Sequence, residues 1–112
     1  MADRFAGRWS GAAEQDVTDI LEFVARQDGI ARALDLYANL REAVDSLALL
    51  PRRARIVPEL RDIGLHDFRE ILVGPYRMFF RVEQQVVLLL GVVDGRRDLA
   101  ELLFERALRI AE

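Results

Sequence analysis

Arginine is the side chain on which binding or catalysis by this chain would depend. The sequence contains 16 Lys and Arg residues, and every one of them is arginine. The guanidinium group is a planar fork that stays protonated and holds a carboxylate or a phosphate through two parallel hydrogen bonds. We predict a binding site for a target or partner that is made of five arginines in the second half of the chain. They are Arg69, Arg77, Arg81, Arg96 and Arg97.

The alternation of residues 76–83 predicts how these arginines are arranged. In a β-strand successive side chains point to opposite faces, so Arg77 and Arg81 share one face of this strand. Arg69, in the preceding strand, is expected to join them, and the Arg96-Arg97 pair follows the end of the next strand. The guanidinium groups are thus predicted to converge on one surface of the sheet. The alternative is that some of them form ion pairs with nearby acidic residues, namely Glu70, Glu83 and Asp94.

Acid–base chemistry has few candidate residues. Cleavage of RNA would need a base for the 2′-hydroxyl proton and an acid for the leaving oxygen, and an arginine that stays protonated cannot be the base. His66 is the only histidine, and its place in a polar loop indicates an ordinary surface residue. Asp94 and Glu70 could accept a proton, but nothing in the sequence selects either. Enzymatic activity therefore stays open, with binding favoured.

Composition narrows the class of protein. With no cysteine and a single histidine, neither a disulfide nor a zinc site is expected, and no glycine-rich phosphate loop predicts a cofactor. A formal net charge of −3 argues against a protein devoted entirely to nucleic-acid binding. Residues 1–5 lack the apolar stretch of a signal peptide, and the longest apolar run, 86–93, is too short to span a bilayer. We expect a cytoplasmic protein without membrane contact.

Hydropathy patterns divide the chain into the elements of one domain, 1–112. Ser10 is the expected cap of the first helix and Pro51 ends the second, and a basic and polar loop follows at 52–66. The predicted elements are a strand at 4–9, helices at 13–27 and 30–50, strands at 68–73, 76–83 and 86–93, and a helix from Asp98. This order predicts an α+β fold of two layers, with an N-terminal strand, an antiparallel helical hairpin, a three-stranded antiparallel meander and a C-terminal helix.

Two stretches of sequence resemble the RelE/ParE toxin superfamily. Residues 68–82, FREILVGPYRMFFRV, are similar to the "REL…YR…Y.V" core of ParE-like members, and residues 92–98, VVDGRRD, are similar to the "V.HGRRD" ending. Trp9-Ser10 and residues 57–60 resemble the opening and the middle of the family. Since the resemblance covers roughly residues 9–105, the chain is identified as similar to the ParE-like plasmid stabilisation toxins.

The resemblance implies the toxin of a type II toxin–antitoxin system, held in a hetero-oligomer by its antitoxin. A ParE-like toxin would bind and poison DNA gyrase. The alternative is a RelE-like ribosome-dependent endoribonuclease, in which Arg77, Arg96 and Arg97 would contact the phosphate of the messenger RNA. We expect an acidic or amphipathic segment of the antitoxin to cover the arginine face.

The departures from the family pattern favour the ParE-like function. The ribonucleases use several basic residues, often lysine, with a tyrosine or histidine near the C-terminus. This chain has no lysine, and residues 99–112 contain neither tyrosine nor histidine. Asp94 stands where many relatives have histidine, which leaves a decayed, inactive toxin as a third possibility.

Overall fold

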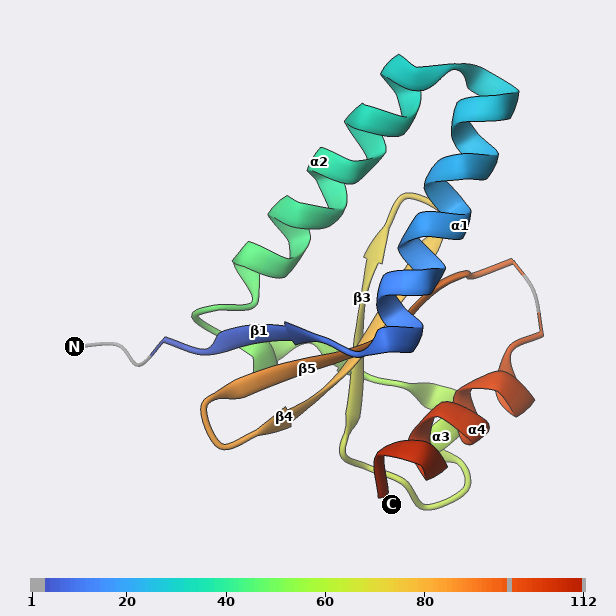
Figure 1. Cartoon of the computed structure of the whole chain (residues 1–112). Helices are drawn as coiled ribbons and strands as arrows, with labels where there is room; N and C mark the ends of the chain where they lie inside the picture. Colours follow the sequence, from blue (N-terminus) through green and yellow to red (C-terminus); the bar gives the residue numbers. More distant parts are fainter. Residues whose placement is uncertain (1–3, 97, 112) are drawn as a thin grey trace.

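The computed structural model describes residues 4–96 and 98–111 and confirms the predicted α+β fold and order of elements (Figure 1). The elements are β1 (Ala6–Trp9), α1 (Gly11–Asp28), α2 (Ile30–Ser46), the 3-10 helix η1 (Pro51–Arg53), β2 (Arg55–Ile56), α3 (Pro58–Arg61), β3 (Phe68–Val73), β4 (Tyr76–Glu83), β5 (Val86–Asp94) and α4 (Ala100–Ala111). No helix in these described ranges has the length and apolar character needed to cross a membrane.

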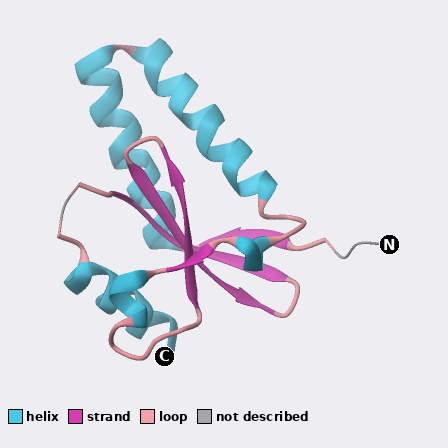
Figure 2. Ribbon diagram, turned by 180° about the vertical axis from the view of Figure 1, so that it is seen from behind, coloured by secondary structure: helices cyan, strands magenta, loops and turns pink. Residues whose placement is uncertain are grey.

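The five strands form one sheet in the order β1-β5-β4-β3-β2. Figure 2 shows this sheet from the side opposite to that of Figure 1. The strands β3, β4 and β5 make the predicted antiparallel meander, while β1 runs parallel to β5. Two tight turns join the meander, and each contains a residue with positive φ, namely Gly74 at 57° and Gln84 at 51°. The strand β5 therefore lies between two neighbours, as its continuous apolar sequence predicts.

The helical hairpin begins and breaks where its capping residues stand. The N–H of Ala13 donates to the hydroxyl oxygen of Ser10 over 3.1 Å, which caps α1 as predicted. Gly29 separates α1 from α2 with a φ of 94°, a conformation that glycine adopts at little cost. The helix α2 ends at Ser46, before the predicted stop at Pro51, because residues 47–49 already form a turn.

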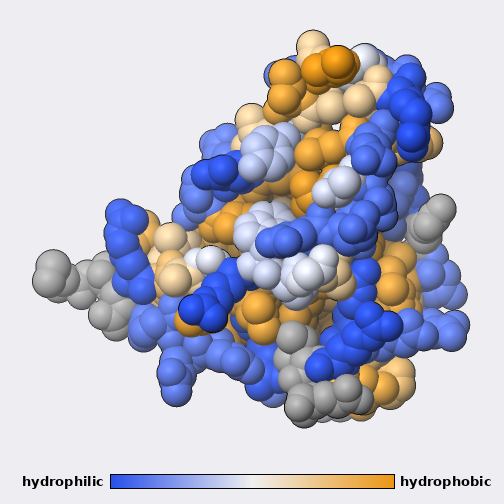
Figure 3. Space-filling model, viewed as in Figure 1, coloured by the Kyte–Doolittle hydropathy of each residue, from blue (hydrophilic) through white to orange (hydrophobic). Residues whose placement is uncertain are grey.

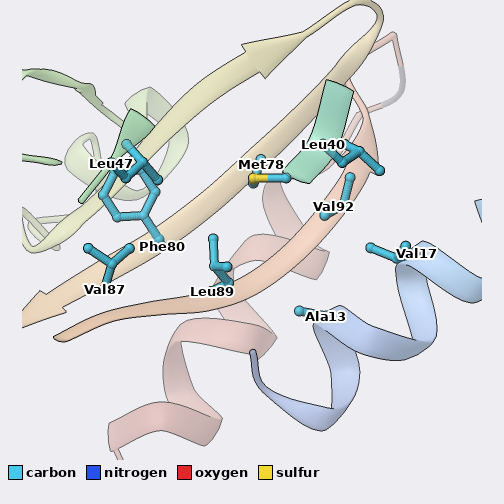
Figure 4. Close-up of a cluster of buried hydrophobic side chains, with 9 residues drawn as sticks. All are labelled: Ala13, Val17, Leu40, Leu47, Met78, Phe80, Val87, Leu89 and Val92. Atoms are coloured by element: carbon cyan, nitrogen blue, oxygen red, sulfur yellow. The ribbon is translucent and has the colours of Figure 1, made fainter. Parts of the chain in front are cut away.

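The hairpin covers one face of the sheet and forms the larger core with it. Figure 4 shows side chains from α1, α2, β4 and β5 meeting there. The members of this cluster are Ala13, Val17, Leu40, Leu47, Met78, Phe80, Val87, Leu89 and Val92. Its residues on β4, Met78 and Phe80, are two positions apart, as the period of a strand requires, whereas Leu89 and Val92 on β5 are three positions apart.

A second core lies on the opposite face of the sheet. Phe79 and Leu90 pack there against Leu60 of α3 and Leu103 of α4. The helices α3 and α4 thus add a partial layer to the two predicted layers. The predicted loop at 52–66 is replaced in part by η1, β2 and α3, which are too short to show a hydropathy period.

A bulge in β5 shifts the alternation of its side chains between the two cores by one residue. Phe79 pairs with Gly91 and Phe80 with Leu89, so Leu90 has no partner on β4. The side chain of Arg106 reaches this point from α4 and donates to the carbonyl oxygen of Leu90 over 2.7 Å. A methyl group on Gly91 would lie 2.5 Å from the ring of Phe79 and 2.8 Å from Nη1 of Arg106. Glycine is therefore required at the bulge.

We expect Gly91→Ala to lower the free energy of unfolding by about 1–3 kcal/mol, because the added methyl group overpacks the second core. Gly11→Ala is the matched control, since nothing lies within 4 Å of its added carbon. Urea denaturation of both variants measures the difference. Equal stabilities would show that Phe79 and Arg106 move aside freely.

Candidate functional site

Arg77 of β4 is held between two carboxylates. Its Nη1 and Nη2 lie 2.6 Å from Oε2 and Oε1 of Glu59, and its Nε donates to Oε1 of Glu70 over 2.7 Å. Glu59 comes from α3 and Glu70 from β3, so the guanidinium links three elements. The Arg77 side chain is 9% exposed and that of Glu70 is fully buried. The hydrogen-bond donors of the Arg77 guanidinium are therefore already paired with carboxylates of the protein itself.

A second arginine completes this cluster. Arg55 of β2 donates from Nε to Oε2 of Glu70 over 2.5 Å, so two arginines share one buried carboxylate. We call Arg55, Glu59, Glu70 and Arg77 the Glu70 cluster. Its two positive and two negative charges cancel. Burial of a carboxylate without such partners is strongly unfavourable, which explains why Glu70 can sit inside the sheet.

The electrostatics of the Glu70 cluster favour the ionised forms of Glu59 and Arg77. Hydrogen bonding from Arg77 lowers the pKa of Glu59 below its usual value of 4.5, although partial burial acts in the opposite direction. The same hydrogen bonds to Glu59 raise the pKa of Arg77. Neither group is therefore poised to exchange protons near neutral pH.

The other predicted arginines do not all reach this surface. Arg81 shares the face of Arg77, as predicted, and its Nη2 lies 2.6 Å from Oε1 of Glu83. Arg69 lies on the opposite face, because it pairs with Phe80, whose side chain belongs to the hairpin core. Its Nη1 donates to the carbonyl oxygen of Ala54 over 2.7 Å. The expectation that Arg69 joins Arg77 is thus wrong, since the strand register turns it away.

Arg96 and Arg77 line the same cavity at the end of the sheet. A cavity of about 350 Å³ is lined by both residues, together with Arg55 and Glu59. Nε and Nη2 of Arg96 lie 2.9 and 2.7 Å from the carboxylate of Asp94, and the Arg96 side chain is 74% exposed. The predicted role of Arg97 lies outside the described residues.

The candidate bases are either paired with arginine or exposed in a loop. Asp94 and Glu70 both accept hydrogen bonds from arginine, and His66 is exposed in its loop, as predicted. In the described ranges no group of three or more His, Cys, Asp or Glu side chains could hold a metal ion. The arrangement is therefore suited to binding through its exposed arginines.

The sequence did not single out Arg55 and Glu59 as site residues. The alternation of β3 carries the signal for Glu70, since it shares one face of this strand with the apolar residues Phe68 and Leu72. Glu59 has no such signal, because α3 is only four residues long and its position depends on the fold of the whole chain.

Comparison with known proteins now gives two similarities. A family model described as the ParE toxin of the type II toxin–antitoxin system, parDE, matches residues 8–99. A chain of the solved chromosomal ParDE TA system from P. aeruginosa is similar in fold, with a TM-score of 0.68 and 18% sequence identity. That similarity covers 81% of this chain and 96% of the other. A search of curated sequences finds no match.

Removal of Arg77 should damage the fold before it affects any binding. Arg77→Ala leaves the buried Glu70 with one partner fewer, and we expect a loss of about 3–5 kcal/mol in the free energy of unfolding. Arg96→Ala is the control, because its ion pair is exposed and screened by solvent, and its stability should stay close to that of the wild type. Urea denaturation of the wild type and of both variants measures these differences in unfolding free energy. A stable Arg77→Ala variant would mean that Arg55 alone satisfies Glu70.

The lowered pKa of Glu59 gives the stability a pH dependence. The ionised carboxylate stabilises the fold fully above 4.5, and this contribution is lost as the pH falls through the lower pKa of the folded state. The difference in unfolding free energy between wild type and Glu59→Gln should therefore be large at pH 7 and shrink below 4.5. Urea titrations across this range measure it. A constant difference would contradict a charge-based role.

Proposed function

This chain belongs to the family of ParE toxins of type II toxin–antitoxin systems, and from that premise we propose that it acts by binding and poisoning DNA gyrase. It is neutralised by a cognate antitoxin in a toxin–antitoxin hetero-oligomer. The described residues act as one toxin domain, in the cytoplasm where gyrase works. The system stabilises the plasmid or chromosomal segment that encodes it.

The filled fork of Arg77 supports binding over RNA cleavage. A ribonuclease would need this guanidinium to stabilise the charge that develops on the phosphate. In this chain the group already makes short hydrogen bonds to Glu59 and Glu70, and a phosphate would have to displace two carboxylates from it. The Glu70 cluster therefore supports a structural role for Arg77 and a toxin that does not depend on phosphoryl chemistry.

The exposed arginines, unlike Arg77, are available for contact with a macromolecule. Arg96 projects from the rim of the cavity with an exposed guanidinium, and Arg81 is partly exposed on the same face. We propose that these two residues, with Arg97, contact acidic groups of gyrase or of the antitoxin. An exposed ion pair such as that between Arg96 and Asp94 exchanges partners at low cost.

The test is DNA supercoiling by purified gyrase with and without the folded protein. We expect inhibition together with trapped, cleaved DNA. The double variant Arg96→Ala with Arg97→Ala should inhibit less, because it removes two positive charges, one of them the exposed guanidinium of Arg96. The matched control is Arg26→Ala with Arg32→Ala, two exposed arginines of the hairpin, which should inhibit like the wild type.

A folded protein without effect on gyrase would contradict the proposed target. Cleavage of messenger RNA on purified ribosomes would then be measured, and its detection would favour the RelE-like alternative. Absence of both activities would indicate a decayed toxin. Co-expression with the product of the adjacent gene tests the antitoxin separately, since a true antitoxin should co-purify and relieve toxicity.

A further inference from the structure

Two stretches of the chain carry arginine but no acidic residue. They are residues 4–13 and residues 46–58, and neither contains aspartate or glutamate. Acidic residues are frequent elsewhere, since the whole chain of 112 residues has 19 of them. The arginines of the two stretches are Arg4, Arg8, Arg52, Arg53 and Arg55. If the fold brings the stretches together, it gathers positive charge at one place.

The structure does place these two stretches side by side. The N–H of Phe5 donates to the carbonyl oxygen of Ala48 over 2.7 Å, and the guanidinium of Arg52 lies 5.5 Å from the ring centre of Phe5. Figure 3, in the view of Figure 1, shows strongly hydrophilic groups on this part of the surface. The ring holds the plane of the Arg52 guanidinium without using its N–H donors, so these remain available to a ligand.

Four arginines of this region are exposed, and we call Arg4, Arg8, Arg52 and Arg53 the β1 patch. None of the four takes part in an ion pair within residues 4–96 and 98–111. The remaining arginine of the two stretches is different, since Arg55 is bound to the buried Glu70. The positive charge of the β1 patch is therefore not neutralised by ion pairs within the described chain.

The β1 patch presents arginine on both faces of the sheet. Arg8 pairs in register with Leu88, which packs against the second core, so its side chain lies on the face away from the hairpin. Arg52 lies over Phe5, which packs against the hairpin core. Since β1 is the first strand of the sheet, the two side chains flank a ridge.

A ridge with positive charge on both sides is complementary to a groove of duplex DNA. The duplex carries one negative charge for about every 1.7 Å of its axis, and its phosphates follow both sides of a major groove about 12 Å wide, which admits a two-stranded β-ribbon. The rest of the protein is repelled by DNA, because the formal net charge of −3 becomes −7 when the four positive charges of the β1 patch are taken away. Contact with DNA is therefore confined to the β1 patch.

We propose that the β1 patch binds the phosphate backbone of duplex DNA without reading its sequence. The choice of DNA rests on the proposed function, because a toxin bound to gyrase lies beside the DNA on which gyrase acts. Arginine forks hold phosphates through paired hydrogen bonds, and such contacts orient a protein on the duplex without selecting bases. The toxin thus contacts the enzyme and its substrate through different surfaces.

The first test measures binding of the wild-type protein to a fluorescent duplex of about 20 base pairs by anisotropy, in the absence of gyrase. Four phosphate contacts predict that the logarithm of the association constant falls with the logarithm of the salt concentration, with a slope of about −3 to −4. Duplexes of unrelated sequence should bind alike. Absence of binding at about 50 mM salt, or binding that does not change with salt, would overturn the proposal.

Substitutions in the protein locate the site. Arg8→Gln with Arg52→Gln should weaken duplex binding by about tenfold and make the salt slope less negative by about two, one for each lost contact. The matched control is Arg26→Gln with Arg109→Gln, which removes the same charge from two exposed arginines, each one helical turn after a glutamate. Arg8→Lys with Arg52→Lys keeps the charge and should bind nearly as the wild type does. If the control pair weakens binding as much as the first pair, the attraction is a general charge effect and the proposal is wrong.

Two further measurements separate this proposal from its alternatives. A peptide of alternating Glu and Ser should displace the duplex poorly at equal concentration of charge, and efficient displacement would show that the β1 patch takes carboxylates as readily as phosphates. With gyrase present, the Arg8→Gln, Arg52→Gln variant should need about tenfold more protein than the control variant to trap cleaved DNA. Equal potency of the two variants would contradict a DNA contact at gyrase and leave the target intact, whereas duplex binding without any inhibition of gyrase would contradict the target and leave the β1 patch intact.

Discussion

The carboxylate of Glu70 is buried inside the sheet, and its two arginine partners determine how the surrounding elements can be placed. An isolated charge at this depth would be neutralised or would unfold the site. Arg77 from β4 and Arg55 from β2 satisfy it, and Glu59 then completes the fork of Arg77. Four elements are thus joined through two carboxylates and two guanidinium groups. The pairing gives specificity to the arrangement of β2 and α3, in addition to the packing of Leu60 in the second core.

The same constraint divides the arginines into two groups. Those on the face of the sheet near Glu70 are matched by carboxylates and serve the fold or form exchangeable surface pairs. Those around β1, namely Arg4, Arg8, Arg41 and Arg52, take part in no ion pair within the described ranges, and Arg41 shares a cavity wall with Asp45. A single residue type therefore supports stability in one place and is available for recognition in another.

Most of the fold can be predicted from the sequence, because its long elements have clear periods. The bounds of β3 and β4 agree with the predicted strands, and Ser10 caps α1 as expected. The elements between residues 51 and 61 could not be predicted, since none of them is long enough to repeat a hydropathy period. The site was predicted less well. Arg77 was identified, but the face of Arg69 depends on strand register, and the partner Glu59 depends on tertiary packing.

The parallel pairing of β1 with β5 has a consequence for the order of events during synthesis. Ala6 pairs with Val86, so the first strand to leave the ribosome must wait for the last strand before it finds its place. Closing so long a loop costs chain entropy, and contacts distant in sequence form late in folding. The hairpin α1–α2 relies on short-range contacts and can form earlier. The nascent chain therefore lacks its finished sheet until Val86–Asp94 has left the ribosome.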